Sequence, residues 1–147
     1  MMYQSTRTEG QQFSFDQVVL KGLASDGGLY LPTEWPTISE SEYDQWRSLS
    51  YKDLAFEVMR KFIGDSIPED DFRGIVDRAY SQFRHPAVAP MVQLDSNLWV
   101  LELFQGPTLA FKDFALQFLG QLLNYLLDRE GQRDVNLGAT SGDTGSA

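Results

Sequence analysis

The chain has no cysteine and only one histidine among its 147 residues. The absence of cysteine excludes disulfides, thiolate metal sites and cysteine nucleophiles. A single histidine, His85, cannot form a histidine-rich metal cluster or catalytic machinery that needs several imidazoles. Any chemistry in this chain must therefore use lysine, hydroxyl, carboxylate or backbone groups, and no metal site is expected.

Cations are scarce and long apolar runs are missing. Lys and Arg total 12 against 21 Asp and Glu, which gives a formal net charge of −9. Such an acidic chain repels phosphate backbones and anionic lipids, so neither a nucleic acid nor a membrane is an expected partner. No apolar run approaches the ~18 residues of a membrane span, and the N-terminus lacks the apolar core of a signal peptide. We expect a soluble, cytoplasmic protein.

The first ninety residues read as short helices with clear start and stop signals. The apolar content of 42% is that of a packed protein. Serine caps, a first-turn proline and glycine stops delimit the segments. The expected elements are a helix after Ser14, a brief strand at residues 29–31, a helix after Ser39, a helix between Ser50 and Gly64, and a helix after Pro68. The apolar stripes of these helices indicate a core and carry no chemical signal.

The pattern changes after residue 90. Residues 98–104 are almost continuously apolar, which is typical of a parallel strand buried on both faces. An amphipathic helix follows from Phe111 to Leu126, and residues 134–140 are expected to form a second strand. Strand, helix, strand and glycine-rich turn make a βαβ unit of a parallel sheet.

We therefore expect an α/β fold in two parts, a mainly helical region at residues 1–90 and the first βαβ elements of a parallel sheet at residues 91–147. One βαβ pair cannot cover both faces of such a sheet. The sequence thus indicates the truncated front end of a larger protein, in which Ala147 is an imposed boundary. Uncovered apolar surface would favour self-association of such a fragment, and its oligomeric state is left open.

Lys112 is the first candidate for chemistry. It lies between Phe111 and Asp113 at the start of the amphipathic helix. The helix dipole and the apolar neighbours both disfavour the ammonium form there, and a free amine is what imine formation and proton abstraction need. On position alone, a surface lysine paired with Asp113 is the simpler interpretation.

The glycine-rich turn at residues 138–145 is the second candidate. Its glycines allow a ligand to approach the backbone, and Ser141 and Thr144 supply hydroxyl donors. It matches neither a P-loop nor a dinucleotide fingerprint. The alternative is a tight strand-to-helix connection with Asp143 or Thr144 as N-cap. Both candidates follow strands of one parallel sheet, so a possible amine nucleophile and an anion site would share its carboxyl edge.

Four blocks of sequence resemble the threonine synthase family. Residues 106–113, GPTLAFKD, are similar to the family's lysine motif, and residues 137–147, LGATSGDTGSA, to its substrate loop. Residues 3–7, YQSTR, and residues 26–32, DGGLYLP, resemble its N-terminal landmarks. The blocks occur in the family's order across the whole chain, which would cover about the first third of such an enzyme.

The resemblance implies a tryptophan-synthase-β-like, fold type II architecture, with pyridoxal 5′-phosphate bound to Lys112 as a Schiff base. The implied reaction converts O-phosphohomoserine and water to threonine and phosphate, with Lys112 moving protons at Cα and Cβ. Ser141, Gly142 and Thr144 would hold the substrate carboxylate, and Asp143 would lie near the cofactor's ring oxygen. Phe111 and Asp113 would be positional supports.

The family's ligands for the cofactor phosphate and the pyridine nitrogen have no counterpart in these 147 residues. We therefore expect this chain alone to be inactive. Two alternatives stay open. One is a non-catalytic threonine-synthase-like module, and the other is a different fold type II enzyme such as a serine or threonine dehydratase or a cysteine synthase.

Overall fold

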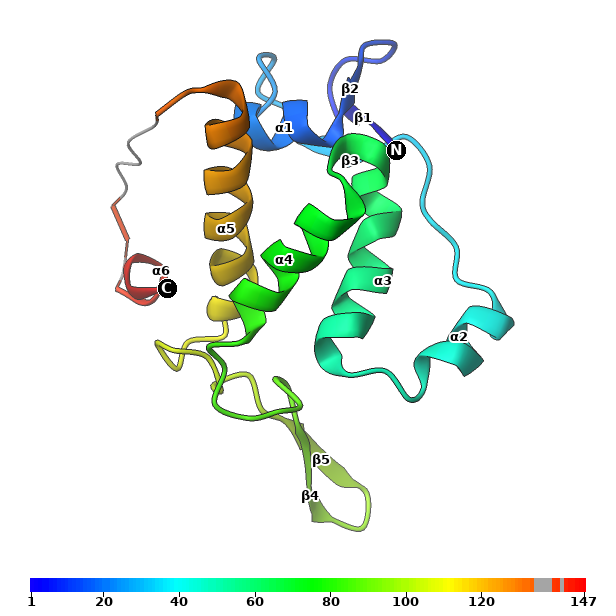
Figure 1. The fold of residues 1–147 in the computed structure, drawn as a ribbon, viewed down its shortest axis with the longest axis vertical. Helices are drawn as coiled ribbons and strands as arrows, with labels where there is room; N and C mark the ends of the chain where they lie inside the picture. The colour runs from blue at the N-terminus through cyan, green and yellow to red at the C-terminus, as the bar shows by residue number, and fades with distance from the viewer. Residues whose placement is uncertain (134–138, 141) are drawn as a thin grey trace. The chain divides into compact units, whose positions relative to one another are not determined.

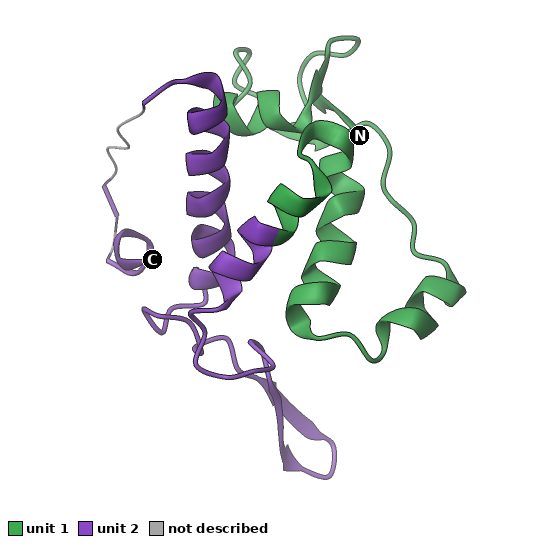
Figure 2. Ribbon diagram, viewed as in Figure 1, with its two compact units in different colours: residues 1–73 green, residues 74–147 purple. Residues whose placement is uncertain are grey.

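Helices make up most of the regular structure in the computed structural model, which describes residues 1–133, 139–140 and 142–147 (Figure 1). The elements are β1 (Met2–Ser5), β2 (Gln12–Ser14), α1 (Phe15–Lys21), β3 (Tyr30–Pro32), α2 (Glu40–Trp46), α3 (Tyr51–Ile63), η1 (Gly64–Ser66), α4 (Glu69–Tyr80), β4 (Met91–Asp95), β5 (Leu98–Leu101), α5 (Asp113–Glu130) and α6 (Asp143–Ser146). Residues 1–73 form one compact unit and residues 74–147 a second (Figure 2). The functional division expected at residue 90 stays a prediction.

A three-stranded antiparallel sheet of order β2-β1-β3 begins the first unit. The turn before β3 is tied to the end of β1 through Asp26. The Asp26 carboxylate accepts hydrogen bonds from Thr8 Oγ1 (2.5 Å), Gly28 N (2.8 Å) and Ser5 Oγ (2.8 Å). These bonds, with Thr8 the largest contributor, hold the pKa of Asp26 below its ordinary value because they stabilise the charged form.

The helices of the first unit start where the sequence predicts. The Ser39 and Glu42 pair forms the expected capping box of α2, and Ser50 Oγ accepts from Asp53 N at the start of α3. α3 packs its apolar face on the first turns of α4, where the rings of Phe56 and Phe72 lie 5.1 Å apart. Both rings are buried, so this helix pair is the core of the unit.

The second unit is built around α5. Leu122 and Leu126 on this helix are almost completely buried. Phe83 packs edge-on against Phe114 with ring centroids 4.9 Å apart, and Tyr80 Oη donates to Phe114 O at 3.1 Å. The first turn of α5, which follows Lys112, is thereby fixed to the end of α4.

The strand at residues 98–104 differs from its prediction. β5 covers only Leu98–Leu101 and pairs antiparallel with β4, a strand that the sequence analysis did not identify. Every residue of both strands is exposed rather than buried. The physical reason is that a short turn joins the two strands locally, whereas parallel pairing needs a crossover to a distant strand.

The chain has the mixed α/β character expected from its sequence. Most of the second predicted strand, residues 134–140, lies outside the described residues. Ser141 also lies outside them. None of the helices among the described residues combines the length and the apolar character needed to cross a membrane.

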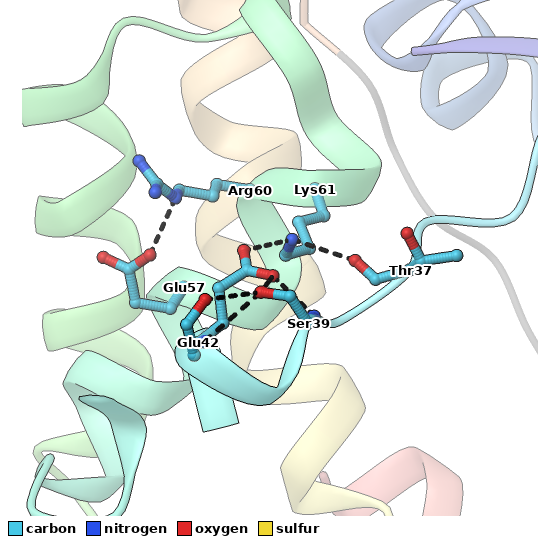
Figure 3. A network of polar contacts seen from close by, with 7 residues as sticks. Thr37, Ser39, Glu42, Glu57, Arg60 and Lys61 are labelled. Carbon is cyan, nitrogen blue, oxygen red and sulfur yellow. Dashed lines mark hydrogen bonds and ion pairs between the residues drawn. The ribbon is translucent and has the colours of Figure 1, made fainter. Parts of the chain in front are cut away.

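A polar network joins the segment before α2 to α3 in the first unit (Figure 3). Lys61 Nζ donates to Glu42 Oε1 at 2.6 Å and to Thr37 O at 3.1 Å, and Glu42 Oε2 accepts from Ser39 N at 2.8 Å. The bond from Lys61, followed by the Ser39 bonds, lowers the pKa of Glu42 from 4.5 to about 2. The ionised carboxylate is therefore the form that stabilises this corner of the fold.

We predict that this network makes the first unit sensitive to acid. A depressed folded-state pKa stabilises the fold above the unfolded value of 4.5, and the contribution is lost as pH falls toward 2. The denaturation midpoint of the wild-type chain should fall with pH in this window, and Glu42→Gln should show a smaller pH dependence. Glu40→Gln is the control, because it removes a charge from the same helical turn but leaves the Lys61 bond. Equal pH dependence of the three proteins would contradict this role of Glu42.

Candidate active site

Lys112 is the residue immediately before α5, with helical backbone angles (φ −63°, ψ −20°). Its placement at the N-terminal end of the amphipathic helix agrees with the sequence analysis. The side chain is half-buried. Because the first turn of α5 is held by Tyr80 and Phe83, the backbone that carries the lysine is fixed on its C-terminal side.

Asp113 fixes the backbone on the other side of the lysine. This residue is 0% exposed, and its two carboxylate oxygens accept from Thr108 N (2.9 Å, to Oδ2) and from Thr108 Oγ1 (2.8 Å, to Oδ1). Such charge-assisted bonds offset the penalty of burying a carboxylate. The pair of bonds closes residues 108–113 into a loop, and we call it the Thr108–Asp113 clamp.

The clamp needs glycine at position 106. A Cβ atom there would overlap the Asp113 carboxylate oxygen and would lie 2.7 Å from Asp113 Cγ. The turn also holds Leu109 in the left-handed region (φ 66°), where a non-glycine residue is strained by about 1–2 kcal/mol. Strained residues of this kind concentrate at functional sites, since surrounding structure must hold them in place.

Thr144 lies beside the lysine. Lys112 Nζ donates to Thr144 Oγ1 at 2.5 Å, and Gln117 Nε2 on α5 donates to Ala147 O at 2.9 Å. α6 is therefore attached to α5 by a contact at the lysine and by a second contact one turn further along α5.

The other predicted site residues surround this contact in the sequence. Gly142 precedes α6 with φ 117°, a conformation that favours glycine, and its N–H donates to Thr140 Oγ1 at 3.1 Å. Asp143 is exposed at the first position of α6. Ser141 lies outside the described residues. The structure thus brings Lys112 and Thr144 together and places Gly142 and Asp143 next to Thr144 along the chain.

Two contributors were missed by the sequence analysis, Thr108 and Gln117. Thr108 lies within the GPTLAFKD block, and its spacing of five residues from Asp113 was the available signal. Gln117 is a polar residue among the apolar positions of α5, and its partner on a distant segment has no sequence signal.

The contacts around Lys112 leave its amine able to bind a ligand covalently. Within the described part of the chain, Lys112 forms no ion pair, because Asp113 is engaged by Thr108 and the lysine amine contacts a neutral hydroxyl. The simple surface ion pair with Asp113 is therefore not observed. No group of acidic or histidine side chains among the described residues could hold a metal ion.

Comparisons with known proteins agree on one family. A family model described as threonine synthase N terminus matches residues 2–80. Threonine synthase of Pseudomonas aeruginosa is 55% identical over 147 residues, which cover 100% of this chain and 31% of the relative. Threonine synthase-like 2 of Xenopus laevis is 42% identical over 148 residues, which cover 100% of this chain and 31% of the relative.

The solved structures agree with the sequence relatives. The crystal structure of threonine synthase from Brucella melitensis with bound pyridoxal phosphate matches this chain with a TM-score of 0.95 at 50% identity. The match covers 99% of this chain and 31% of that chain. This chain therefore has the fold of the N-terminal part of that structure and spans about a third of the length of its relatives.

We predict that Gly106→Ala destabilises the second unit, because the added methyl group displaces the Asp113 carboxylate from Thr108. Overpacking of a filled site costs about 1–3 kcal/mol. Gly120→Ala is the matched control on the exposed side of α5, where an added Cβ meets nothing within 4 Å. This control should stabilise the chain by about 0.5–1 kcal/mol, since alanine is the better helix former. Chemical denaturation measures both changes, and a neutral Gly106→Ala would contradict the clamp.

Proposed function

This chain belongs to the threonine synthase family, and from that membership we propose that it is the N-terminal part of a threonine synthase. The proposed reaction converts O-phosphohomoserine and water to threonine and phosphate. The cytoplasmic location expected from the sequence stays a prediction.

The single observation that carries the proposal is the contact between Lys112 Nζ and Thr144 Oγ1. It joins the two sequence blocks, residues 106–113 and 137–147, that were singled out separately for an amine and for an anion-binding turn. A lysine near a hydroxyl-bearing turn has the groups needed for amine chemistry on a substrate that carries a carboxylate.

The cofactor of the family is pyridoxal 5′-phosphate, which the Brucella melitensis structure contains. The residues described here fit it, because the half-buried Lys112 has no carboxylate partner in the described residues that would compete for its amine. Lys112 would hold the cofactor covalently, and Asp143 would lie near its ring oxygen. When bound, the cofactor supplies a ring that stabilises negative charge at the substrate's Cα.

We assign proton transfer and substrate binding to side chains and backbone groups of this chain. Lys112 takes one proton from Cα and one from Cβ, phosphate leaves from Cγ, and protons return to Cγ and to Cα as water adds at Cβ. Ser141, Gly142 and Thr144 hold the substrate carboxylate, so that the Cα proton faces Lys112. The Thr108–Asp113 clamp keeps the lysine backbone in place, which matters because small displacements of a catalytic group slow a reaction strongly.

A relative named threonine synthase-like 2 supports a second candidate, a non-catalytic threonine-synthase-like module. A dehydratase of related fold is the other alternative. Substrate assays separate the candidates: O-phosphohomoserine yields phosphate with a threonine synthase, threonine yields ammonia with a dehydratase, and a non-catalytic protein yields neither.

We predict that Lys112 is indispensable. The test protein is this chain fused in place of the aligned first 31% of the Pseudomonas aeruginosa threonine synthase, since the chain alone is expected to release no phosphate. Lys112→Ala should lower the rate of phosphate release by about a hundredfold or more, because a positioned acid–base group accelerates a reaction by at least roughly that factor. Lys52→Ala on α3 is the control and should keep the activity. An active Lys112→Ala fusion, or ammonia release from threonine by the unaltered fusion, would overturn the proposal.

A further inference from the structure

The segment between α4 and β4 contains a strained turn. Val88 lies in the left-handed region with φ 58°, although it is β-branched and only 2% exposed. β-Branched residues rarely adopt this conformation, because the side chain collides with the backbone. Among the described residues, Val88 and Leu109 are the non-glycine residues with positive φ, and both lie in the second unit. Strain of this kind persists only where the surrounding structure holds it, so the turn is a candidate for a functional role.

Two hydrogen bonds that converge on His85 close the turn. Val88 N donates to His85 O at 2.8 Å, and Ala87 N donates to His85 Nδ1 at 3.1 Å. Pro86 occupies the second position of this four-residue turn, where its ring fixes φ at the value that the position needs. Ala89 N then donates to Ala87 O at 2.5 Å across Val88, which makes the rare, positive-φ form of a three-residue turn. His85 therefore supplies both acceptors of the first turn, one from its backbone and one from its ring.

The two ends of the turn are bonded to the stretch of chain that leads into the lysine motif. Arg84, directly before the turn, donates from its backbone N to Gln105 O at 2.8 Å. Pro90, directly after the turn, accepts at its O from Glu102 N at 2.9 Å. Gln105 is followed at once by Gly106, the first residue of the motif. The shape of the turn therefore sets where the chain enters the lysine motif.

The chain before the turn holds the other end of the lysine motif. Tyr80 Oη donates to Phe114 O at 3.1 Å, and the ring centroids of Phe83 and Phe114 lie 4.9 Å apart. Phe114 belongs to the first turn of α5, two residues after Lys112. One short stretch of chain thus contacts the polypeptide on both sides of the lysine, and the bonds within the turn set the shape of that stretch.

We propose that His85 is a positioning residue for Lys112. Its ring nitrogen closes the turn that keeps Arg84 and Pro90 on their partners at the start of the lysine motif. In this role His85 acts through the backbone of the motif rather than on the reacting atoms. The consequence for the reaction rests on the proposed function, in which Lys112 transfers protons, whereas the fixing of the motif by His85 holds whichever reaction the protein catalyses.

Hydrogen–deuterium exchange on the chain itself tests the fixing of the motif. His85→Leu keeps a bulky side chain but removes the acceptor of the Ala87 N–H. Peptides that span residues 102–113 should then exchange about fivefold faster, the factor that corresponds to one net hydrogen bond. His85→Asn should restore slow exchange, because an Asn side-chain oxygen accepts from the N–H two residues further on. Gln82→Leu, at an exposed position of the same segment, is the control for the added apolar group.

Three results of this experiment would contradict the proposal. The first is unchanged exchange of the motif peptides in His85→Leu. The second is an equal acceleration in peptides from the second half of α5, residues 122–130, because His85 would then support only the stability of the whole unit. The third is fast exchange in His85→Asn, because the acceptor at this position would then not be what holds the turn.

The kinetic test uses the fusion with the remaining part of the Pseudomonas aeruginosa threonine synthase. His85→Leu should lower kcat for phosphate release by about tenfold and change KM by less than about twofold, since a displaced lysine slows proton transfer but leaves substrate binding in place. His85→Asn and Gln82→Leu should keep both constants. A raised KM with an unchanged kcat would show that His85 does not position Lys112. An unaltered fusion that releases no phosphate would contradict the proposed reaction alone, because the exchange experiment decides the positioning independently.

Discussion

The buried carboxylate of Asp113 is the constraint on which the candidate site depends. Its bonds to Thr108 remove it from Lys112, define the turn that strains Leu109, and exclude any side chain at Gly106. A carboxylate at this depth is tolerated only because both oxygens are engaged. The lysine beside it therefore has a fixed backbone and, in the described region, an amine that is not paired with a carboxylate.

A second constraint acts at the start of the lysine motif, residues 106–113. β5 leads within a few residues into Gly106, so the strand and the lysine motif form one continuous segment. The bond from Arg84 N to Gln105 O fixes the start of the lysine motif, while α5 fixes its end.

Local signals made much of this structure predictable. The capping pairs at Ser39 and Ser50 act within three residues, and the helical period placed Lys112 at the start of α5. The antiparallel hairpin was missed because a nearly continuous apolar strand has the same sequence pattern in parallel and in antiparallel pairing. Because Lys112 and Asp113 are neighbours in the sequence, an ion pair between them was the simpler prediction. In the structure the turn directs the Asp113 carboxylate to Thr108 instead, and sequence neighbourhood does not predict the shape of that turn. The roles of Ser141, Gly142, Asp143 and Thr144 stay predictions.

The central claim is that Lys112 is the lysine that binds pyridoxal phosphate, and locating the cofactor tests it most directly. The fusion with the remaining part of the Pseudomonas aeruginosa enzyme would be incubated with pyridoxal phosphate, reduced with borohydride to make the linkage permanent, and digested for peptide mass spectrometry. The account predicts the phosphopyridoxyl mass on the peptide that contains Lys112. Modification of Lys21, Lys52 or Lys61 at equal yield, or an unmodified Lys112 in a folded protein, would contradict it.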